Sequence, residues 1–144
     1  MDGLEFIALA QRMAASGGDR AWFRTVSSRA YYGAFHGATE FLAELNVHPT
    51  KTERVHFIVH AYLENSMNRP SENAGRLLGD LHVRRKEADY KLASGPYETA
   101  AFARYSVEMA LRIRELIVEC TTDPLRTAVH RAVLEYQNML RGKK

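Results

Sequence analysis

The chain has only one cysteine and no long apolar run, and each of these two shortages excludes a class of protein. Cys120 has no partner for an internal disulfide, which favours a reducing compartment over a disulfide-stabilised secreted domain. No stretch of about 18 apolar residues occurs, and no basic segment followed by an apolar run opens the chain, so the sequence predicts neither a membrane span nor a secretory signal. We therefore expect a cytoplasmic protein with no membrane association.

Patterns typical of β-strands, nucleotide-binding loops and metal sites are also missing. Alternating runs rich in Val and Ile are absent, and no glycine-rich loop follows a strand. His56 and His60, four residues apart, could present two metal ligands on one helical face, but the spacing supplies no convincing third ligand. We expect neither a metal nor a cofactor.

What the chain does contain is enough apolar sequence for one core. Its 144 residues are 46% hydrophobic, which fits a single domain over residues 1–144. The net charge is only +3, but 15 of the 20 basic residues are Arg. Arginine offers a planar set of donors suited to phosphate, so this bias favours anionic partners, unless it reflects a GC-rich genome.

The apolar periodicity predicts helices throughout, at about residues 3–15, 19–46, 50–64, 71–92, 97–120 and 124–140. Asp19 is a good N-cap, Thr50 to Glu53 form a capping box, Ser71 is the expected cap of the fourth helix, and Asp123-Pro124 starts the sixth. The pattern indicates an all-α protein of five to six helices, with a core over residues 3–120 and an additional helix at 124–140. The apolar stripe of that last helix either closes the bundle or meets another chain.

Residues 29–36, with the sequence Arg-Ala-Tyr-Tyr-Gly-Ala-Phe-His, stand out in the second helix. Tyr31, Tyr32 and Phe35 supply bulk, while Gly33 and Gly37 are small. Since glycine inside a helix costs about 1 kcal/mol relative to alanine, the two glycines predict a close approach by another helix. A crowded core helix with no further role explains the same pattern.

Residues 77–92 form the second informative segment. Arg85 lies within the apolar stripe of the predicted helix, with Arg84 on one margin and Asp89 on the other. A charge in such a stripe must be matched, and Asp89 is placed for an i,i+4 ion pair. Three roles for the Arg85 side chain therefore stay open. It forms an internal ion pair, it extends to the surface, or it lies in a groove where it meets a phosphate.

These two segments together resemble the HEPN family of small helical proteins. The resemblance lies in residues 29–36 and in Arg85-Lys-Glu-Ala-Asp-Tyr90, with Arg54-Val-His56 and the helix over 97–120 in the expected order. It covers roughly residues 3–120. It implies an antiparallel up-and-down bundle, usually a homodimer, with links to RNA cleavage, toxin–antitoxin or defence systems and nucleotidyltransferase partners.

Ribonucleases of that family carry Arg-x(4–6)-His in a cleft between subunits and need no metal. Counting from Arg85 reaches Tyr90, Lys91 and Leu92, and counting from Arg84 reaches no histidine either. We therefore expect an RNA- or nucleotide-binding protein without the usual ribonuclease site. The predicted binding residues are Arg84, Arg85, Asp89, Tyr90 and Tyr32.

Two alternatives stay open from the sequence. One is an active, metal-independent endoribonuclease toxin in which His82 or His36 acts with Arg85. The other is a protein-interaction module that regulates a nucleotidyltransferase partner.

Overall fold

The computed structural model of the chain describes residues 2–93 and 95–142. These residues contain helices and no strand, which confirms the prediction of an all-α protein. The helices are α1 (Gly3–Ser16), α2 (Arg20–Glu44), α3 (Val55–Glu64), α4 (Arg69–Tyr90), α5 (Ala100–Glu119) and α6 (Leu125–Gly142), with a 3-10 turn, η1 (Gly95–Glu98), before α5.

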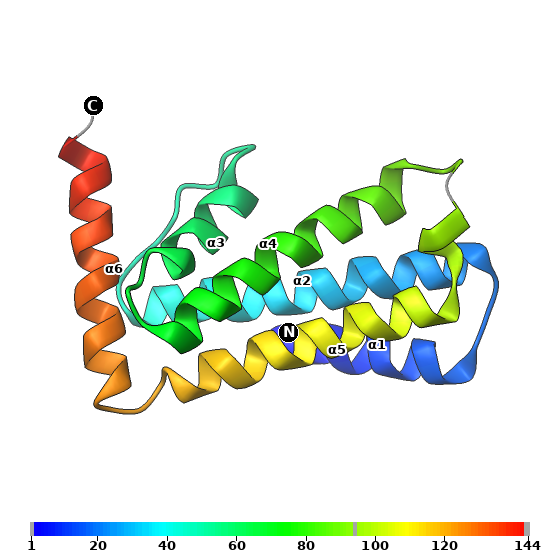
Figure 1. Cartoon of the computed structure of the whole chain (residues 1–144), viewed down its shortest axis with the longest axis horizontal. Coiled ribbons are helices and arrows are strands. Elements are labelled where there is room, and N and C mark those ends of the chain that lie inside the picture. Colours follow the sequence, from blue (N-terminus) through cyan, green and yellow to red (C-terminus); the bar gives the residue numbers. More distant parts are fainter. Residues whose placement is uncertain (1, 94, 143–144) are drawn as a thin grey trace.

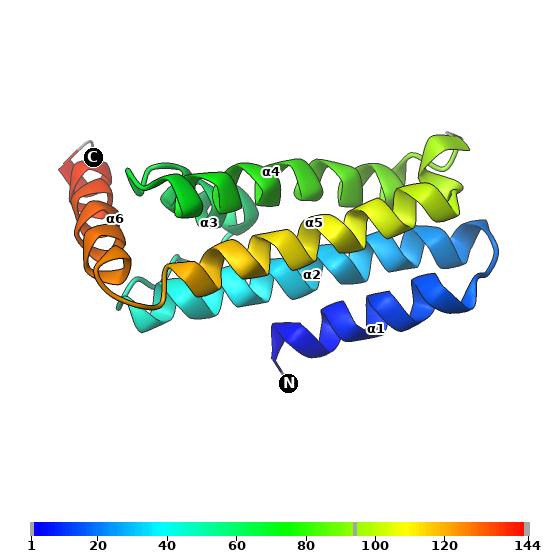
Figure 2. The same ribbon diagram turned by 60° about the horizontal axis from the view of Figure 1, so that its bottom comes forward.

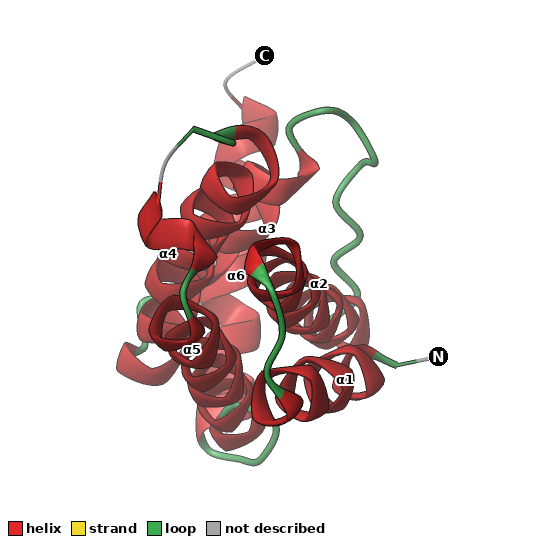
Figure 3. Cartoon of the chain, turned by 90° about the vertical axis from the view of Figure 1, so that its right-hand side faces the viewer, coloured by secondary structure: helices red, strands yellow, loops and turns green. Residues whose placement is uncertain are grey.

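Four long helices make the body of the molecule. Helices α1, α2, α4 and α5 alternate in direction along the long axis, as an up-and-down bundle requires (Figures 1 and 2). Figure 3, which looks along the bundle, shows these four helices side by side around a common centre. Helix α3 packs against α4, and α6 stands across one end of the bundle (Figure 1).

Helix α2 is the centre of the core, because it packs against α1, α4 and α5. The side chains that helical spacing places on its apolar face are buried, namely Val26, Ala30, Ala34 and Phe41, apart from Phe23, which is partly buried. Fully buried side chains of α4 and α5, among them Leu78, Leu81 and Ile113, belong to the same core. Each such side chain contributes about 1.5–3 kcal/mol through removal from water.

The two glycines of α2 differ in their surroundings. A Cβ built on Gly33 would lie 2.7 Å from the Gly3 carbonyl oxygen and 2.5 Å from a side-chain carbon of Ile7, so α1 approaches closely there as predicted. A Cβ on Gly37 would meet no atom within 4 Å. A Cβ on Gly3 would lie 3.0 Å from the Gly37 backbone nitrogen, so the start of α1 also lies close to this part of α2, but away from the space that a Gly37 side chain would enter.

This difference gives a paired test of helix packing. Gly33→Ala should lower the free energy of unfolding by about 1–3 kcal/mol, because the methyl group must displace the backbone of α1. Gly37→Ala should raise it by about 0.5–1 kcal/mol, because alanine favours the helix and clashes with nothing. Urea denaturation of the two variants measures both changes. Equal effects at the two positions would contradict this account of the α1–α2 contact.

The starts of α3 and α4 differ from the predicted ones. The Thr50–Glu53 capping box does not form, since α3 begins at Val55 without a side-chain cap and the Thr52 hydroxyl accepts from the Arg54 N–H instead. Ser71 does not cap α4, because Pro70 fits the first turn and lets the helix begin at Arg69. The Ser71 side chain is buried and donates to the Asn68 carbonyl.

The ends around the connection from α4 to α5 also differ from the prediction. Helix α5 begins at Ala100, where the Thr99 hydroxyl accepts from the Phe102 N–H, and Tyr97 belongs to η1. Helix α4 ends at Tyr90, so Leu92 is exposed and does not continue the apolar stripe.

Helix α6 closes the end of the bundle with part of its predicted stripe. Val129, Ala132 and Val133 are buried, and the Tyr136 ring meets the Tyr62 ring of α3 edge to face. Leu140 is exposed. Helix α6 begins at Leu125, and the Asp123 carboxylate accepts from the backbone N–H of Thr127. Among the described residues, no helix is both long and apolar enough to span a membrane.

Candidate functional site

Arg85 lies between α4 and α2 with its side chain only 13% exposed. Its Nε is 3.0 Å from Asp89 Oδ2, which is the ion pair that the i,i+4 spacing predicts. Its Nη2 donates a 2.6 Å hydrogen bond to the Tyr32 hydroxyl on α2. The Ser28 hydroxyl donates weakly to the same Asp89 oxygen, at 3.4 Å. The charge is therefore held by partners on two helices.

Three tyrosine rings surround the Arg85 guanidinium. Its carbon lies 5.1 Å from the ring centroid of Tyr32, 5.9 Å from that of Tyr31 and 6.0 Å from that of Tyr90. A cation at such distances is attracted by the π-electrons of each ring. Tyr31 is fully buried, whereas Tyr90 is 73% exposed, so this tyrosine cage runs from the core to the surface.

The protein uses only some of the hydrogen-bond donors of Arg85. Within residues 2–93 and 95–142, its one hydrogen bond is that to Tyr32. The buried Nε makes no hydrogen bond, because its N–H is not aligned with the Asp89 carboxylate despite their closeness. The arrangement fixes the guanidinium by electrostatics and leaves N–H groups for another acceptor.

Two histidines continue this cluster toward α3. The Tyr31 hydroxyl and His56 Nδ1 are 2.6 Å apart and share a hydrogen bond. The His82 ring is stacked on both Tyr31 and His56, with centroid distances of 5.1 and 4.9 Å, and the Phe35 ring lies 4.6 Å from that of His56. The result is a layer of rings from α2, α3 and α4 behind Arg85.

Burial keeps the groups in this layer neutral. It lowers the pKa of His82 to about 4, with further lowering by the nearby positive charges of Lys86 and Arg85. Burial and Arg85 also lower the pKa of His56. Burial raises the pKa of the Tyr31 hydroxyl well above its ordinary value, and the positive charge of Arg85 offsets this only in part.

His36 lies on the other side of Tyr32, toward α1. It is exposed, its ring stacks on Phe6 with a centroid distance of 5.7 Å, and its centroid is 6.2 Å from that of Tyr32. Of the predicted residues, Arg85, Asp89, Tyr90, Tyr32 and His82 thus come together, with His36 at the margin.

Arg84 faces a different neighbour. Its guanidinium carbon lies 3.9 Å from the Phe102 ring centroid and 4.8 Å from that of Tyr105, both on α5. It also donates to the Phe102 carbonyl and, at 3.5 Å, to the Ser106 hydroxyl. Successive residues of a helix point about 100° apart, so Arg84 does not join the Arg85 site.

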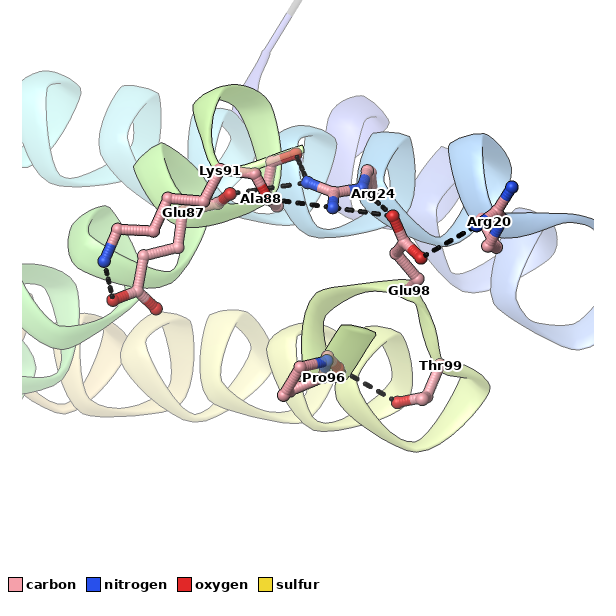
Figure 4. A network of polar contacts seen from close by, with 8 residues as sticks. All are labelled: Arg20, Arg24, Glu87, Ala88, Lys91, Pro96, Glu98 and Thr99. Atoms are coloured by element: carbon pink, nitrogen blue, oxygen red, sulfur yellow. Dashed lines mark hydrogen bonds and ion pairs between the residues drawn. The ribbon is translucent and has the colours of Figure 1, made fainter. Parts of the chain in front are cut away.

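A second buried arginine fixes the end of α4 that carries the site. Arg24 of α2 donates to the backbone carbonyls of Ala88 and Lys91 and pairs with Glu98 of η1 at 2.7 Å. Figure 4 shows its guanidinium between the last turn of α4 and the Glu98 carboxylate. The carbonyls at a helix C-terminus lack intrahelical partners, so a buried cation is well suited to this position.

No three His, Cys, Asp or Glu side chains come together as a metal site would need, among the residues that the structure describes. His56 shares its Nδ1 with Tyr31, and His60 Nδ1 lies 3.6 Å from a Glu64 carboxylate oxygen.

The sequence reasoning missed two members of this arrangement. His56 entered the sequence analysis only as a possible metal ligand and as part of the segment Arg54-Val-His56, and it was not among the predicted site residues. The sequence reasoning gave Arg24 no role, and no local pattern links Arg24 to Glu98, which is 74 residues away.

Comparison of the chain with protein-family models, with curated proteins and with solved structures finds no match.

Proposed function

We propose that the protein binds RNA or a nucleotide through phosphate recognition at Arg85 and does not cleave it. The observation that carries this proposal is the guanidinium of Arg85, held by Asp89 and the tyrosine cage with donors left unused. Arginine donors of this kind bind phosphate oxygens with geometric specificity. The resemblance to HEPN proteins supports the RNA or nucleotide class.

The surface around Arg85 suits a nucleic acid. Exposed Lys86 follows Arg85 on α4, and its positive charge is close enough to lower the pKa of both His56 and His82. The exposed Tyr90 ring offers a face on which a base can stack, next to the cation. Basic groups interleaved with an aromatic ring are the usual means of binding single-stranded RNA without reading its sequence.

The histidines favour binding over cleavage. Metal-free cleavage needs one group to take a proton and another to give one. His82, with a pKa of about 4, is in its neutral form at pH 7 and cannot act as the general acid there, and His56 Nδ1 already shares a hydrogen bond with the Tyr31 hydroxyl. The alternative of an endoribonuclease would need His36, whose ring centroid lies 6.2 Å from that of Tyr32.

The test is binding of a short fluorescein-labelled single-stranded RNA, followed by fluorescence anisotropy. Arg85→Gln should weaken binding about tenfold or more, because charge-assisted hydrogen bonds to phosphate are lost. Tyr90→Ala, at an exposed position, should weaken it about fivefold through lost stacking. Arg104→Gln, an exposed arginine of α5 outside the site, is the matched control and should change little.

Three outcomes would overturn the proposal. They are no RNA binding by the wild-type protein, equal losses for Arg104→Gln and Arg85→Gln, and cleavage of the RNA without added metal. Circular dichroism tests whether each variant is folded. If Arg85→Gln does not fold, the loss of binding in Tyr90→Ala still tests the proposal. Cleavage abolished by His36→Ala or His82→Ala would establish the ribonuclease alternative. The resemblance to HEPN proteins also implies a homodimer and a nucleotidyltransferase partner, and both stay predictions for this protein.

A further inference from the structure

The groove between α2 and α5 is longer than the helix that fills it. Helix α1 has 14 residues and α2 has 25, which correspond to lengths of about 21 and 37 Å at 1.5 Å per residue. Helix α1 therefore begins partway along the other two, as Figure 2 shows at the N-terminal end of the chain. A cavity of about 240 Å³ lies next to the N-terminal turns of α1, between α2 and α5.

The inner wall of this cavity is apolar. Ile7, Phe41, Ile113 and Ile117 line it, together with the backbone of Gly33 and Gly37. A Cβ on Gly37 would meet no atom within 4 Å, so the absence of a side chain there leaves room in the cavity. Apolar cavities of a few hundred Å³ bind small molecules with a compact hydrophobic group.

The rim of the same cavity is acidic. Glu40, Glu44 and Asp2 line it, against a single basic residue, Arg114. Glu40 and Glu44 are exposed, lie four residues apart on α2, and form no ion pair within the described part of the chain. Like charges at this spacing repel each other, and a cation beside both relieves that repulsion.

We propose that this cavity is a binding site for a small amphiphilic cation, an aromatic or branched alkyl group that carries a primary amine. The apolar group enters the space beside Gly37, and the ammonium group lies at the rim near Glu40 and Glu44. The cavity binds the apolar part of the ligand, and the two carboxylates favour a positive charge on it. The site shares no residue with the Arg85 site, so neither proposal depends on the other.

The test compares three ligands of nearly the same shape by amide NMR titration of the full chain. Phenethylamine is the cation, phenethyl alcohol the neutral analogue and phenylacetate the anion. We expect phenethylamine to shift amide signals of residues around Gly37 and Ile113, with an affinity about fivefold higher than that of the alcohol. Phenylacetate should cause no such shifts.

Two variants separate the apolar and ionic parts of the proposal. Gly37→Leu places a side chain in the cavity and should abolish the shifts from phenethylamine. Glu40→Gln combined with Glu44→Gln should remove the preference for the amine over the alcohol, at exposed positions where folding is not at risk. Absence of shifts at the cavity, equal affinity for amine and alcohol in the wild type, or unchanged binding in Gly37→Leu would each overturn it.

Discussion

Arg24→Met is expected to lower the free energy of unfolding by about 3–5 kcal/mol and the Tm by roughly 10 °C or more. The side chain is 9% exposed and binds the Glu98 carboxylate together with the carbonyls at the end of α4. Its removal leaves a partly buried carboxylate without its closest cation and helix-end carbonyls without donors. Thermal and urea denaturation measure the loss.

Arg20→Met is the matched control for this prediction. Arg20 also pairs with Glu98, at 3.7 Å, but its side chain is 82% exposed. Exposed pairs contribute about 0–1 kcal/mol, so this variant should stay close to the wild type. Hydrogen exchange should also quicken in the last turn of α4 in Arg24→Met alone. Similar losses in the two variants would contradict the role given to Arg24.

Stability is expected to fall as the pH is lowered from about 6.5 to 4. His82 takes up a proton near pH 6.5 when the chain is unfolded, but only near pH 4 when it is folded. Over that interval the unfolded state binds more protons, so acid favours unfolding. Above about pH 7 the residue is neutral in both states and contributes no dependence. His56, whose pKa is also lowered, acts in the same direction.

His82→Phe measures the contribution of His82 directly. Phenylalanine keeps a ring against Tyr31 and His56 but cannot titrate, so urea midpoints should change less with pH than in the wild type. His48→Gln, at an exposed position outside the cluster, is the control and should retain the wild-type slope. Identical slopes for His82→Phe and the wild type would show that the acid sensitivity arises elsewhere.

The helices could be predicted from the sequence because their apolar spacing is local. The buried face of α2 is an example, since Val26, Ala30 and Leu42 follow helical spacing and are fully buried. The residues at which the helices begin were harder to predict. Serine is a common N-cap residue, but the Ser71 side chain is buried and donates to the Asn68 carbonyl instead. Tertiary packing decides which of the two roles it takes.

Residue spacing predicts the candidate site only along α4, although Tyr32 of α2 was also among the predicted residues. The ion pair of Arg85 with Asp89 follows from their spacing, and the structure contains it. The contacts with Tyr31, Tyr32 and His56 depend on how α2 and α3 pack against α4, which the spacing within α4 does not specify. The same reasoning explains why Arg84 and Arg85 were grouped although they face different helices.

The different directions of these neighbouring arginines have a mechanical consequence for α4. Arg84 holds the helix to the rings of α5, and Arg85 holds it to Tyr32 of α2. Rotation of α4 about its own axis in either direction would pull one guanidinium away from its partners. The pair thus opposes torsion from both sides, and Arg24 restrains sliding along the axis at the end of the helix. Packing of the bundle therefore fixes the orientation of the Arg85 guanidinium before any ligand binds.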